Sequence, residues 1–296
     1  MKKMKTVLFV FLTLFIYPSI CECQVNPQKK DLNVVLIAGP NDHCDHDSSC
    51  HKYIQDLLVI KDCLSQQTSV GVRMLVAERP KIGSLDDVDV VVVHSAGDDT
   101  VAEWNALFPR VNQKEQYQNS EYAAFLKYFD ERMNEGMGLV VLHYATAVNH
   151  KESISRYKKW IGGYFNEETS EVDGDYSSDG STAIEAVEFA KPNHEILNGI
   201  SPWESESEFY YKLDIEKNAT PILTSNLPID KPRKETIAWA FERPDGGRGF
   251  GFTGCHNHNN MYLEDFRKFV LNAIIWTGGS TVPQKGISSK LSKRYF

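Results

Sequence analysis

Two segments of the chain are dense in apolar, β-branched residues, and they constrain the fold more than any other feature. Leu32 to Ala38 reads LNVVLIA, and Val88 to Val93 reads VDVVVV. β-Branched residues favour strands, and a near-continuous apolar run is typical of a strand that is buried on both faces. Such strands occur in parallel sheets that helices cover on either side. The chain is therefore predicted to be an α/β protein.

Helical and extended patterns alternate around these two strands. Apolar residues recur at helical spacing in three segments, which are 51–65, 119–134 and Tyr262–Trp276. Further strands are expected at Val70–Ala77, Leu139–Leu142, Ala183–Phe189, Glu235–Phe241 and Gly249–Thr253, the last two joined by a Pro-Asp-Gly-Gly turn. This order predicts a single domain with a doubly wound, mostly parallel sheet flanked by helices.

The first 23 residues have the order of a secretory signal peptide. Three lysines lie within Met1–Lys5, and Val7–Tyr17 is an almost unbroken apolar run. The run is shorter than the roughly 20 residues that span a bilayer. Cleavage after Cys23 is favoured over lipid attachment, because the residues before Cys21 and Cys23 are not small. The protein is expected to be exported, periplasmic or secreted, and not inserted in a membrane.

Cleavage would leave an α/β domain over residues 24–280 and a flexible tail over 281–296. The leader carries three lysines and one glutamate, so its removal lowers the net charge from −8 to −10. An acidic protein gains nothing from phosphate backbones or anionic lipids, which argues against nucleic acid and membrane surfaces as partners. No Gly-x-Gly-x-x-Gly follows the first strand, so a nucleotide cofactor is not expected.

Four cysteines would remain in the exported chain, at positions 44, 50, 63 and 255. Cys44 and Cys50 lie in one polar loop and could pair, since an exported compartment permits disulfides. No Cys-x-x-Cys pair occurs, which argues against a structural zinc ribbon.

Histidines are concentrated directly after the predicted strands. The chain has nine, and seven follow four strands: His43, His46, His51, His94, His143, His256 and His258. In an open α/β sheet, ligands bind beyond the carboxyl ends of the strands. Neutral imidazoles together with carboxylates at one edge are what a transition-metal site or an acid/base site requires.

A covalent mechanism is disfavoured. His143 follows a strand at the nucleophile-elbow position of hydrolases and amidotransferases, where Ser or Cys would be needed. No Gly-x-Ser-x-Gly occurs, and Cys255 has no activating neighbours, so it is interpreted as structural. The string His256-Asn257-His258 could suggest a nuclease, but the acidic charge argues against one.

Several segments, in the same order, resemble the ThuA-like (trehalose utilisation) family between about residues 33 and 279. They are Gly138–Ala145, Trp160–Phe165, Pro192–Ile196, Glu208–Tyr210, Gly249–His256 and Leu271–Thr277. The resemblance implies a flavodoxin-like, glutamine-amidotransferase-like fold that lacks the cysteine nucleophile. It also implies a link to sugar metabolism, often to oxidised (3-keto) glycosides. The first loop is longer than the family pattern, so His46 and His51 both remain candidates for its second histidine.

The candidate site residues follow from the strand ends and the resemblance. His143 and Glu208 are expected to form an acid/base pair, with Asp98 as orienter or ligand. A divalent metal ion, zinc or manganese, would be held by His43, His51 and His258. Tyr144, Trp203 and Asn257 are candidates for binding the sugar.

Three functions remain open, and the first two have a small carbohydrate as the expected partner. The first is an exported enzyme that acts on a glycoside or keto-sugar by hydrolysis, elimination or isomerisation. The second is a non-catalytic carbohydrate-binding protein. A plain hydrolase that uses Cys255 or a serine is the third and least favoured reading.

Overall fold

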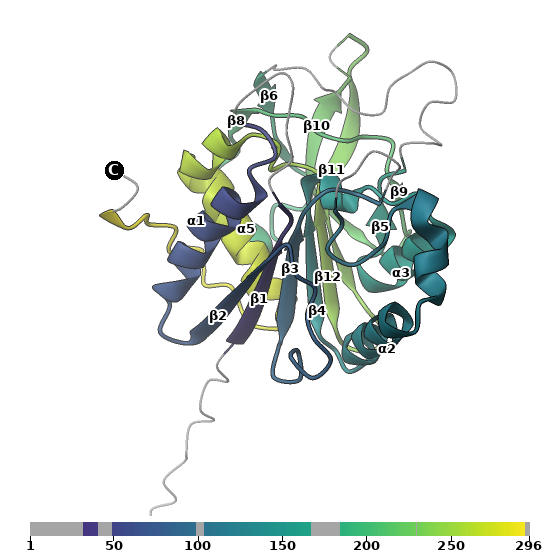
Figure 1. Ribbon diagram of the computed structural model, residues 1–296. Coiled ribbons are helices and arrows are strands. Elements are labelled where there is room, and N and C mark those ends of the chain that lie inside the picture. The colour runs from purple at the N-terminus through teal and green to yellow at the C-terminus, as the bar shows by residue number, and fades with distance from the viewer. Residues whose placement is uncertain (1–31, 41–48, 99–103, 167–183, 229, 294–296) are drawn as a thin grey trace, which may run out of the picture. The chain divides into compact units, whose positions relative to one another are not determined.

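One eight-stranded sheet organises the protein in the computed structural model (Figure 1). Its strands are, in order across the sheet, β2 (Val70–Val76), β1 (Leu32–Ala38), β3 (Val90–His94), β4 (Gly138–Leu142), β12 (Arg248–Phe252), β11 (Arg233–Glu242), β10 (Thr220–Leu227) and β7 (Glu188–Phe189). The pairs from β2 to β12 are parallel, and those from β12 to β7 are antiparallel. The structure describes residues 32–40, 49–98, 104–166, 184–228 and 230–293.

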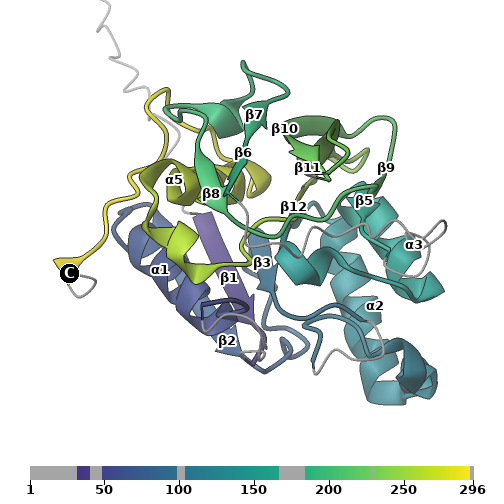
Figure 2. The same ribbon diagram turned by 90° about the horizontal axis from the view of Figure 1, so that it is seen from above.

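Helices cover both faces of the parallel part, as the apolar strands predicted (Figure 2). Helices α1 (Tyr53–Ser65) and α5 (Glu264–Thr277) lie on one face, and α2 (Ser120–Asn134) and α3 (Lys151–Trp160) lie on the other. Alternate residues of β1 enter two separate cores. Val34 and Leu36 pack in the first core with α1 and α5, whereas Val35 and Ile37 pack in the second with α2 and α3. The doubly wound α/β architecture is confirmed.

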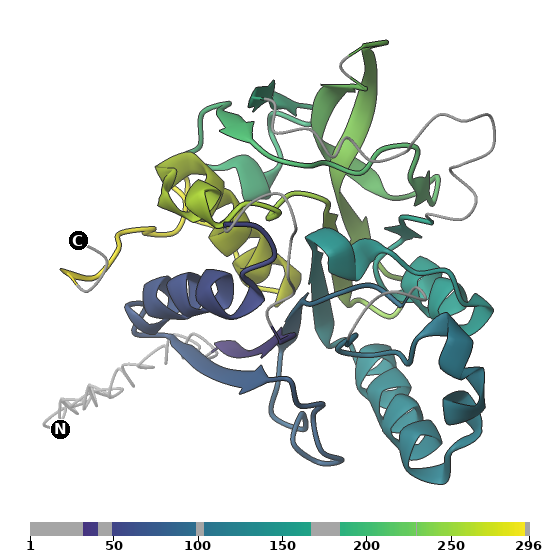
Figure 3. The same ribbon diagram turned by 45° about the horizontal axis from the view of Figure 1, so that its top comes forward.

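Short elements fill the connections. They are the 3-10 helices η1 (Val111–Gln118), η2 (His143–Thr146), η3 (Glu195–Leu197) and η4 (His258–Tyr262), and two small sheets that pair β5 (Gly163–Tyr164) with β9 (Asp214–Ile215) and β6 (Ile184–Ala186) with β8 (Glu204–Glu206). When the carboxyl ends of the parallel strands are turned forward, the sheet runs between the α1–α5 pair and the α2–α3 pair (Figure 3).

Several elements differ from the sequence prediction. The expected strand Ala183–Phe189 is divided, because β6 pairs with β8 whereas β7 pairs with β10. Strand β10 and helix α3 were not predicted. Helix α3 reads KESISRYKKW and buries only Ser153, Tyr157 and Trp160, so its apolar stripe is narrow.

The expected flexible tail is part of the core over residues 281–293. Val282, Ile287 and Leu291 are buried in the same core as α1 and α5. Arg267 Nε donates to the Ser289 carbonyl at 2.7 Å, and the Ser292 amide donates to Asp62 at 3.0 Å. The expectation of a flexible tail did not take into account that three apolar side chains, spaced four or five residues apart, give this segment a face to bury.

Asp31–Phe296 form one compact unit. The predicted signal peptide, residues 1–23, lies outside the described residues. None of the described helices is long and apolar enough to cross a membrane.

Because residues 281–293 pack in the core, we expect them to contribute measurably to the free energy of unfolding. Replacing Ile287 by Ala should lower the free energy of unfolding by about 2 kcal/mol or more, because it leaves a cavity beside α1 and α5. Lys285 is exposed, so Lys285→Ala should change stability by about 0.5 kcal/mol or less. Urea unfolding of both variants checks this; equal midpoints would show that the segment adds nothing to the fold.

Candidate metal centre

The register of the parallel strands brings several chain segments to one edge. Ala38 pairs with His94, His94 with Leu142, and Leu142 with Phe252. The four strands β1, β3, β4 and β12 therefore end at the same level. The residues that follow, including His143 and Thr253, meet at the carboxyl edge, where the sequence placed the site.

His143 is the central residue of this edge. It directly follows β4, begins η2 and is fully buried. Its φ is +50°, a left-handed conformation that non-glycine residues rarely adopt and that costs about 1–3 kcal/mol. The Nδ1 atom lies 2.8 Å from the Thr253 carbonyl, to which it must donate its proton. In the neutral ring, Nε2 therefore carries the lone pair.

Three further groups converge on that lone pair. The Nε2 atom of His51 lies 3.2 Å from His143 Nε2, and His256 Nδ1 lies 3.1 Å from it. Glu208 Oε2 is 3.7 Å from His143 Nε2 and 3.0 Å from His256 Nδ1. One atom from each of the four side chains lies within 4.8 Å of all the others.

Hydrogen bonds alone account poorly for this arrangement. Two imidazole nitrogens and the Tyr210 hydroxyl, at 3.4 Å, all approach one lone pair on His143. A cation at the centre would accept lone pairs from every one of the four ligands at once. Four-coordinate zinc with bonds of about 2.0–2.1 Å would separate its ligand atoms by about 3.3 Å, which lies within the 3.0–3.7 Å range of the four separations given above. The four residues thus fit a metal ion.

Two loops that carry histidines are joined by backbone pairing. Cys50 and Asn257 form an isolated antiparallel bridge, the His51 amide donates to the His256 carbonyl at 3.0 Å, and the His258 amide donates to the Ser49 carbonyl at 2.8 Å. His51 (φ +49°) and Cys255 (φ +78°) are left-handed as well. Three of the five non-glycine residues with positive φ in the described part of the chain thus lie at or beside the cluster.

Glu208 comes from the segment between β8 and β9. Thr253 Oγ1 donates to the Tyr210 carbonyl at 3.3 Å, and Asn260 Nδ2 donates to the Glu206 carbonyl at 2.9 Å. The Tyr210 ring is stacked on the His143 ring, with centroids 5.0 Å apart and planes inclined by 18°. These contacts fix the carboxylate against the sheet edge.

Burial keeps the two innermost histidines neutral. It lowers the pKa of His51 to about 3, with smaller contributions from the charges of His256 and His94. Burial also holds the pKa of His143 well below its usual value, assisted by His256 and His51. Both rings therefore offer lone pairs over the physiological pH range, which a metal ligand must do.

The structure brings three of the predicted site residues together: His143, Glu208 and His51. His143 and Glu208 were expected to be an acid/base pair, whereas the geometry makes them neighbours around a common centre. His256 belongs to the cluster but was not selected from the sequence. The signal was present, since the Thr-Gly-x-His motif of the resemblance ends at this residue.

Two predicted residues lie in other hydrogen-bond systems. Asp98 accepts from the Asn149 amide at 2.6 Å and from the Ser153 hydroxyl, so it stabilises the start of α3 rather than the cluster. His258 Nδ1 contacts Asp56 Oδ1 at 2.6 Å and is not part of the four-residue group. Their expected roles as orienter and metal ligand do not fit this geometry. His43 lies outside the described residues.

The three predicted sugar-binding residues differ in their surroundings. Trp203 is buried against Phe266 and Phe269 in the core, which does not fit an exposed sugar platform. Asn257 is also buried, and its side-chain oxygen caps η4 by accepting from the Asn259 amide at 2.9 Å. Tyr144 is half-buried and stacks beside His51, with ring centroids 5.7 Å apart. Stacking of Tyr144 on a sugar remains a prediction.

The three cysteines that the structure describes provide no nucleophile at this edge. Cys255 is fully buried, and burial raises the pKa of its thiol well above the usual value, so the reactive thiolate is disfavoured. Cys50 is disulfide-bonded, and its partner lies outside the described residues. Cys63 is a buried free thiol near the end of α1, whereas His51 lies just before the start of that helix.

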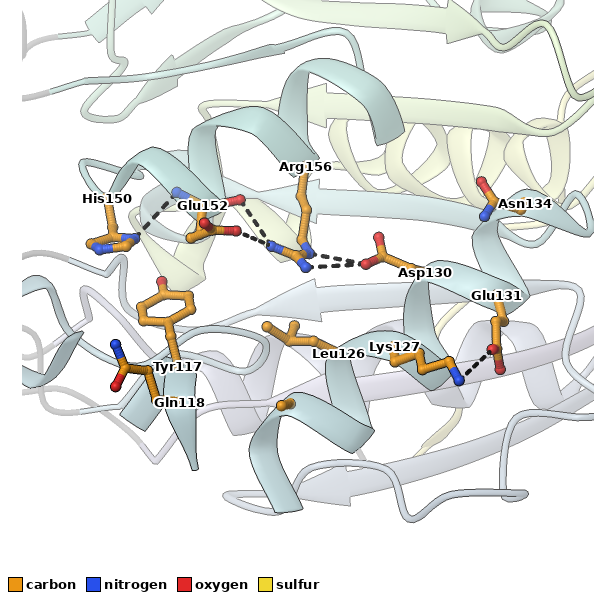
Figure 4. A pocket seen from close by; sticks show the side chains of 11 residues that line it. Tyr117, Gln118, Leu126, Lys127, Asp130, Glu131, Asn134, His150, Glu152 and Arg156 are labelled. Atoms are coloured by element: carbon orange, nitrogen blue, oxygen red, sulfur yellow. Dashed lines mark hydrogen bonds and ion pairs between the residues drawn. The ribbon is translucent and has the colours of Figure 1, made fainter. Parts of the chain in front are cut away.

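A polar groove of about 700 Å³ lies between η1, α2 and α3 (Figure 4). Its charged side chains pair with one another: Arg156 contacts Asp130 and Glu152, and Lys127 contacts Glu131. None of its lining residues belongs to the histidine–glutamate cluster. The groove shows no comparable convergence of groups on one point.

Comparison with known proteins agrees with this architecture. The model of a family described as ThuA, trehalose utilisation, matches residues 35–277. No curated protein matches the chain.

Similar solved structures show the same fold at low sequence identity. A ThuA-like protein of Parabacteroides merdae ATCC 43184 is 16% identical, with a TM-score of 0.57 over 88% of this chain and 96% of that one. A ThuA-like protein of Bacteroides uniformis ATCC 8492 is 13% identical, with a TM-score of 0.56 over 84% and 92%. A cytoplasmic protein of Salmonella typhimurium LT2 is 15% identical, with a TM-score of 0.56 over 83% and 99%.

The depressed histidine pKa values predict acid sensitivity of the metal-free protein. Between about pH 6.5 and pH 3, His51 binds a proton in the unfolded chain but not in the folded one. Stability should therefore be fully present above pH 6.5 and fall on acidification, by at most about 1.4 kcal/mol per pH unit for each such histidine.

Urea unfolding of chelator-treated protein between pH 7 and pH 4 measures this slope. The His51→Gln variant should show a shallower fall, because it lacks one of the buried histidines. An identical slope in the parent and the variant would contradict a neutral, buried His51.

Proposed function

Because the chain belongs to the ThuA (trehalose utilisation) family, we propose that it is an exported, metal-dependent enzyme that acts on a glycoside or keto-sugar. The convergence of His51, His143, His256 and Glu208 on one point is the observation that carries this proposal. Three imidazole nitrogens and one carboxylate oxygen are a donor set for a transition metal. Imidazole suits zinc better than manganese, which prefers oxygen ligands, so zinc is the favoured ion.

The accessible side of the cluster defines where a substrate would approach. His143 is fully buried, whereas the side chains of Glu208 and His256 are 15% and 20% exposed. A sugar oxygen would therefore reach the centre past Glu208 and His256. Tyr144 lies beside His51 and offers a ring face to the same region.

Chain residues supply positioning and hydrogen bonding in this scheme. A bound ion would polarise a carbonyl or hydroxyl oxygen of the sugar as a Lewis acid. The Thr253 carbonyl holds His143 in the tautomer that presents Nε2, and the Tyr210 hydroxyl lies close enough to donate to an oxygen at the centre. Such polarisation would assist hydrolysis, elimination or isomerisation of an oxidised sugar.

Export is supported by two features. The first 23 residues have the pattern of a signal peptide. Cys50 is disulfide-bonded, and structural disulfides persist mainly in oxidising compartments.

A non-catalytic carbohydrate-binding protein is the second candidate. The elbow position at His143 holds no Ser or Cys, and the Cys255 thiol is buried. The same cluster would then bind a sugar through the ion without turnover.

Metal analysis of the purified mature protein tests the ligand set. After exposure to excess zinc and desalting, the parent should retain one ion per chain. His143→Ala and His256→Ala should lose it, since each removes a ligand. His258→Ala should retain it in excess zinc, because His258 contacts Asp56 instead.

The outcomes separate the candidate functions. Metal in the parent with turnover of a 3-keto-glycoside, both lost in His143→Ala, would support an enzyme. Metal and sugar binding without turnover would support the binding protein. A parent that binds no transition metal would refute the centre.

A further inference from the structure

A second group of titratable side chains adjoins the cluster and is centred on Asp56. This residue lies in the first turn of α1 and is fully buried. A buried carboxylate is strongly destabilising unless it is hydrogen-bonded, and Asp56 is not one of the four converging ligands. Its position near the amino end of a helix favours its negative charge.

Two histidines from different segments satisfy this carboxylate. His94, at the end of β3, contacts Oδ2 through Nε2 at 2.9 Å, and His258, at the start of η4, contacts Oδ1 through Nδ1 at 2.6 Å. Each ring donates its N–H, so Asp56 fixes one tautomer in each. His94 Nδ1 is buried and has no hydrogen-bond partner among the described residues, which fits this tautomer.

These contacts join the segments that carry the converging ligands. His51 precedes α1 by two residues, and His256 precedes His258 by two. The loops around His51 and His256 are already paired through Cys50 and Asn257. Asp56 links this paired unit to α1 and to the end of β3, which pairs with β4, the strand that directly precedes His143.

We propose that Asp56 is a positioning residue that holds the His51 and His256 loops in the geometry required for metal binding, acting through His258 and His94. This inference rests on the metal centre proposed above. Residues that orient metal ligands from behind commonly change metal affinity by about 10–100-fold when they are replaced.

The test compares two substitutions on the same helix. Asp56→Asn removes the charge and leaves one acceptor for two histidines. Asp62→Asn makes the same charge change on α1, at a residue that contacts Gln66 and Ser292 instead. Zinc affinity is measured for each folded variant by competition with a chromophoric chelator, and the visible spectrum of the Co²⁺-substituted protein reports ligand geometry.

Asp56→Asn should bind zinc about 10–100-fold more weakly than the parent and give an altered Co²⁺ spectrum. Asp62→Asn should match the parent in both measurements. A purely structural role would lower the stability of metal-free Asp56→Asn but leave the affinity and spectrum of its folded form unchanged, which would overturn the inference while the metal centre stands.

If Asp56→Asn does not fold, His258→Ala decides, because it removes one of the two donors to Asp56 at a partly exposed position. It should still bind one ion in excess zinc, but more weakly than the parent; parent-like affinity would overturn the inference. A parent that binds no zinc at all would overturn both this inference and the proposed function.

Discussion

The in-register parallel pairing of β3, β4 and β12 is the constraint on which the site depends. It ends three strands at one level, so that the residue after β4 lies beside the residue after β12. The Thr253 carbonyl can then accept the His143 Nδ1 proton at 2.8 Å. A one-residue shift of either strand would exchange the inward and outward faces and separate this pair. Backbone register thereby selects the imidazole nitrogen that faces the cluster.

The backbone around the cluster holds conformations that most residues avoid. His51, His143 and Cys255 all have positive φ, although none is glycine. Related α/β folds use a tight strand-to-helix turn to expose a nucleophile. Here the turn at His143 directs an imidazole into a buried setting, where its lone pair meets two other histidines. The geometry suits ligand convergence better than covalent attack.

Much of the fold and part of the site could be predicted from the sequence. The apolar runs located β1 and β3, and helical spacing located α1, α2 and α5. His51 and His143 were selected as site residues because they follow predicted strands. Glu208 was selected because it lies in a segment that resembles the family.

Asp98, His258 and Trp203 do not converge with the cluster, because the position of a residue along the chain does not specify where its side chain points. Asp98 accepts hydrogen bonds from the start of α3. This helix was not predicted, because its apolar stripe is narrow. His258 contacts Asp56. This aspartate lies inside a predicted helix and was not selected, because it does not follow a predicted strand. Trp203 packs on rings of α5 that are distant in sequence.

The residues of the cluster are widely separated along the chain, and this has a consequence for assembly. His51 and His143 are 92 residues apart, and His143 and His256 are 113 apart. Closing such long loops carries an entropic penalty that only the completed sheet offsets. An unfolded chain would therefore offer a metal ion isolated histidines rather than a site. Ion capture would come late in folding, and any ion held would oppose unfolding through mass action.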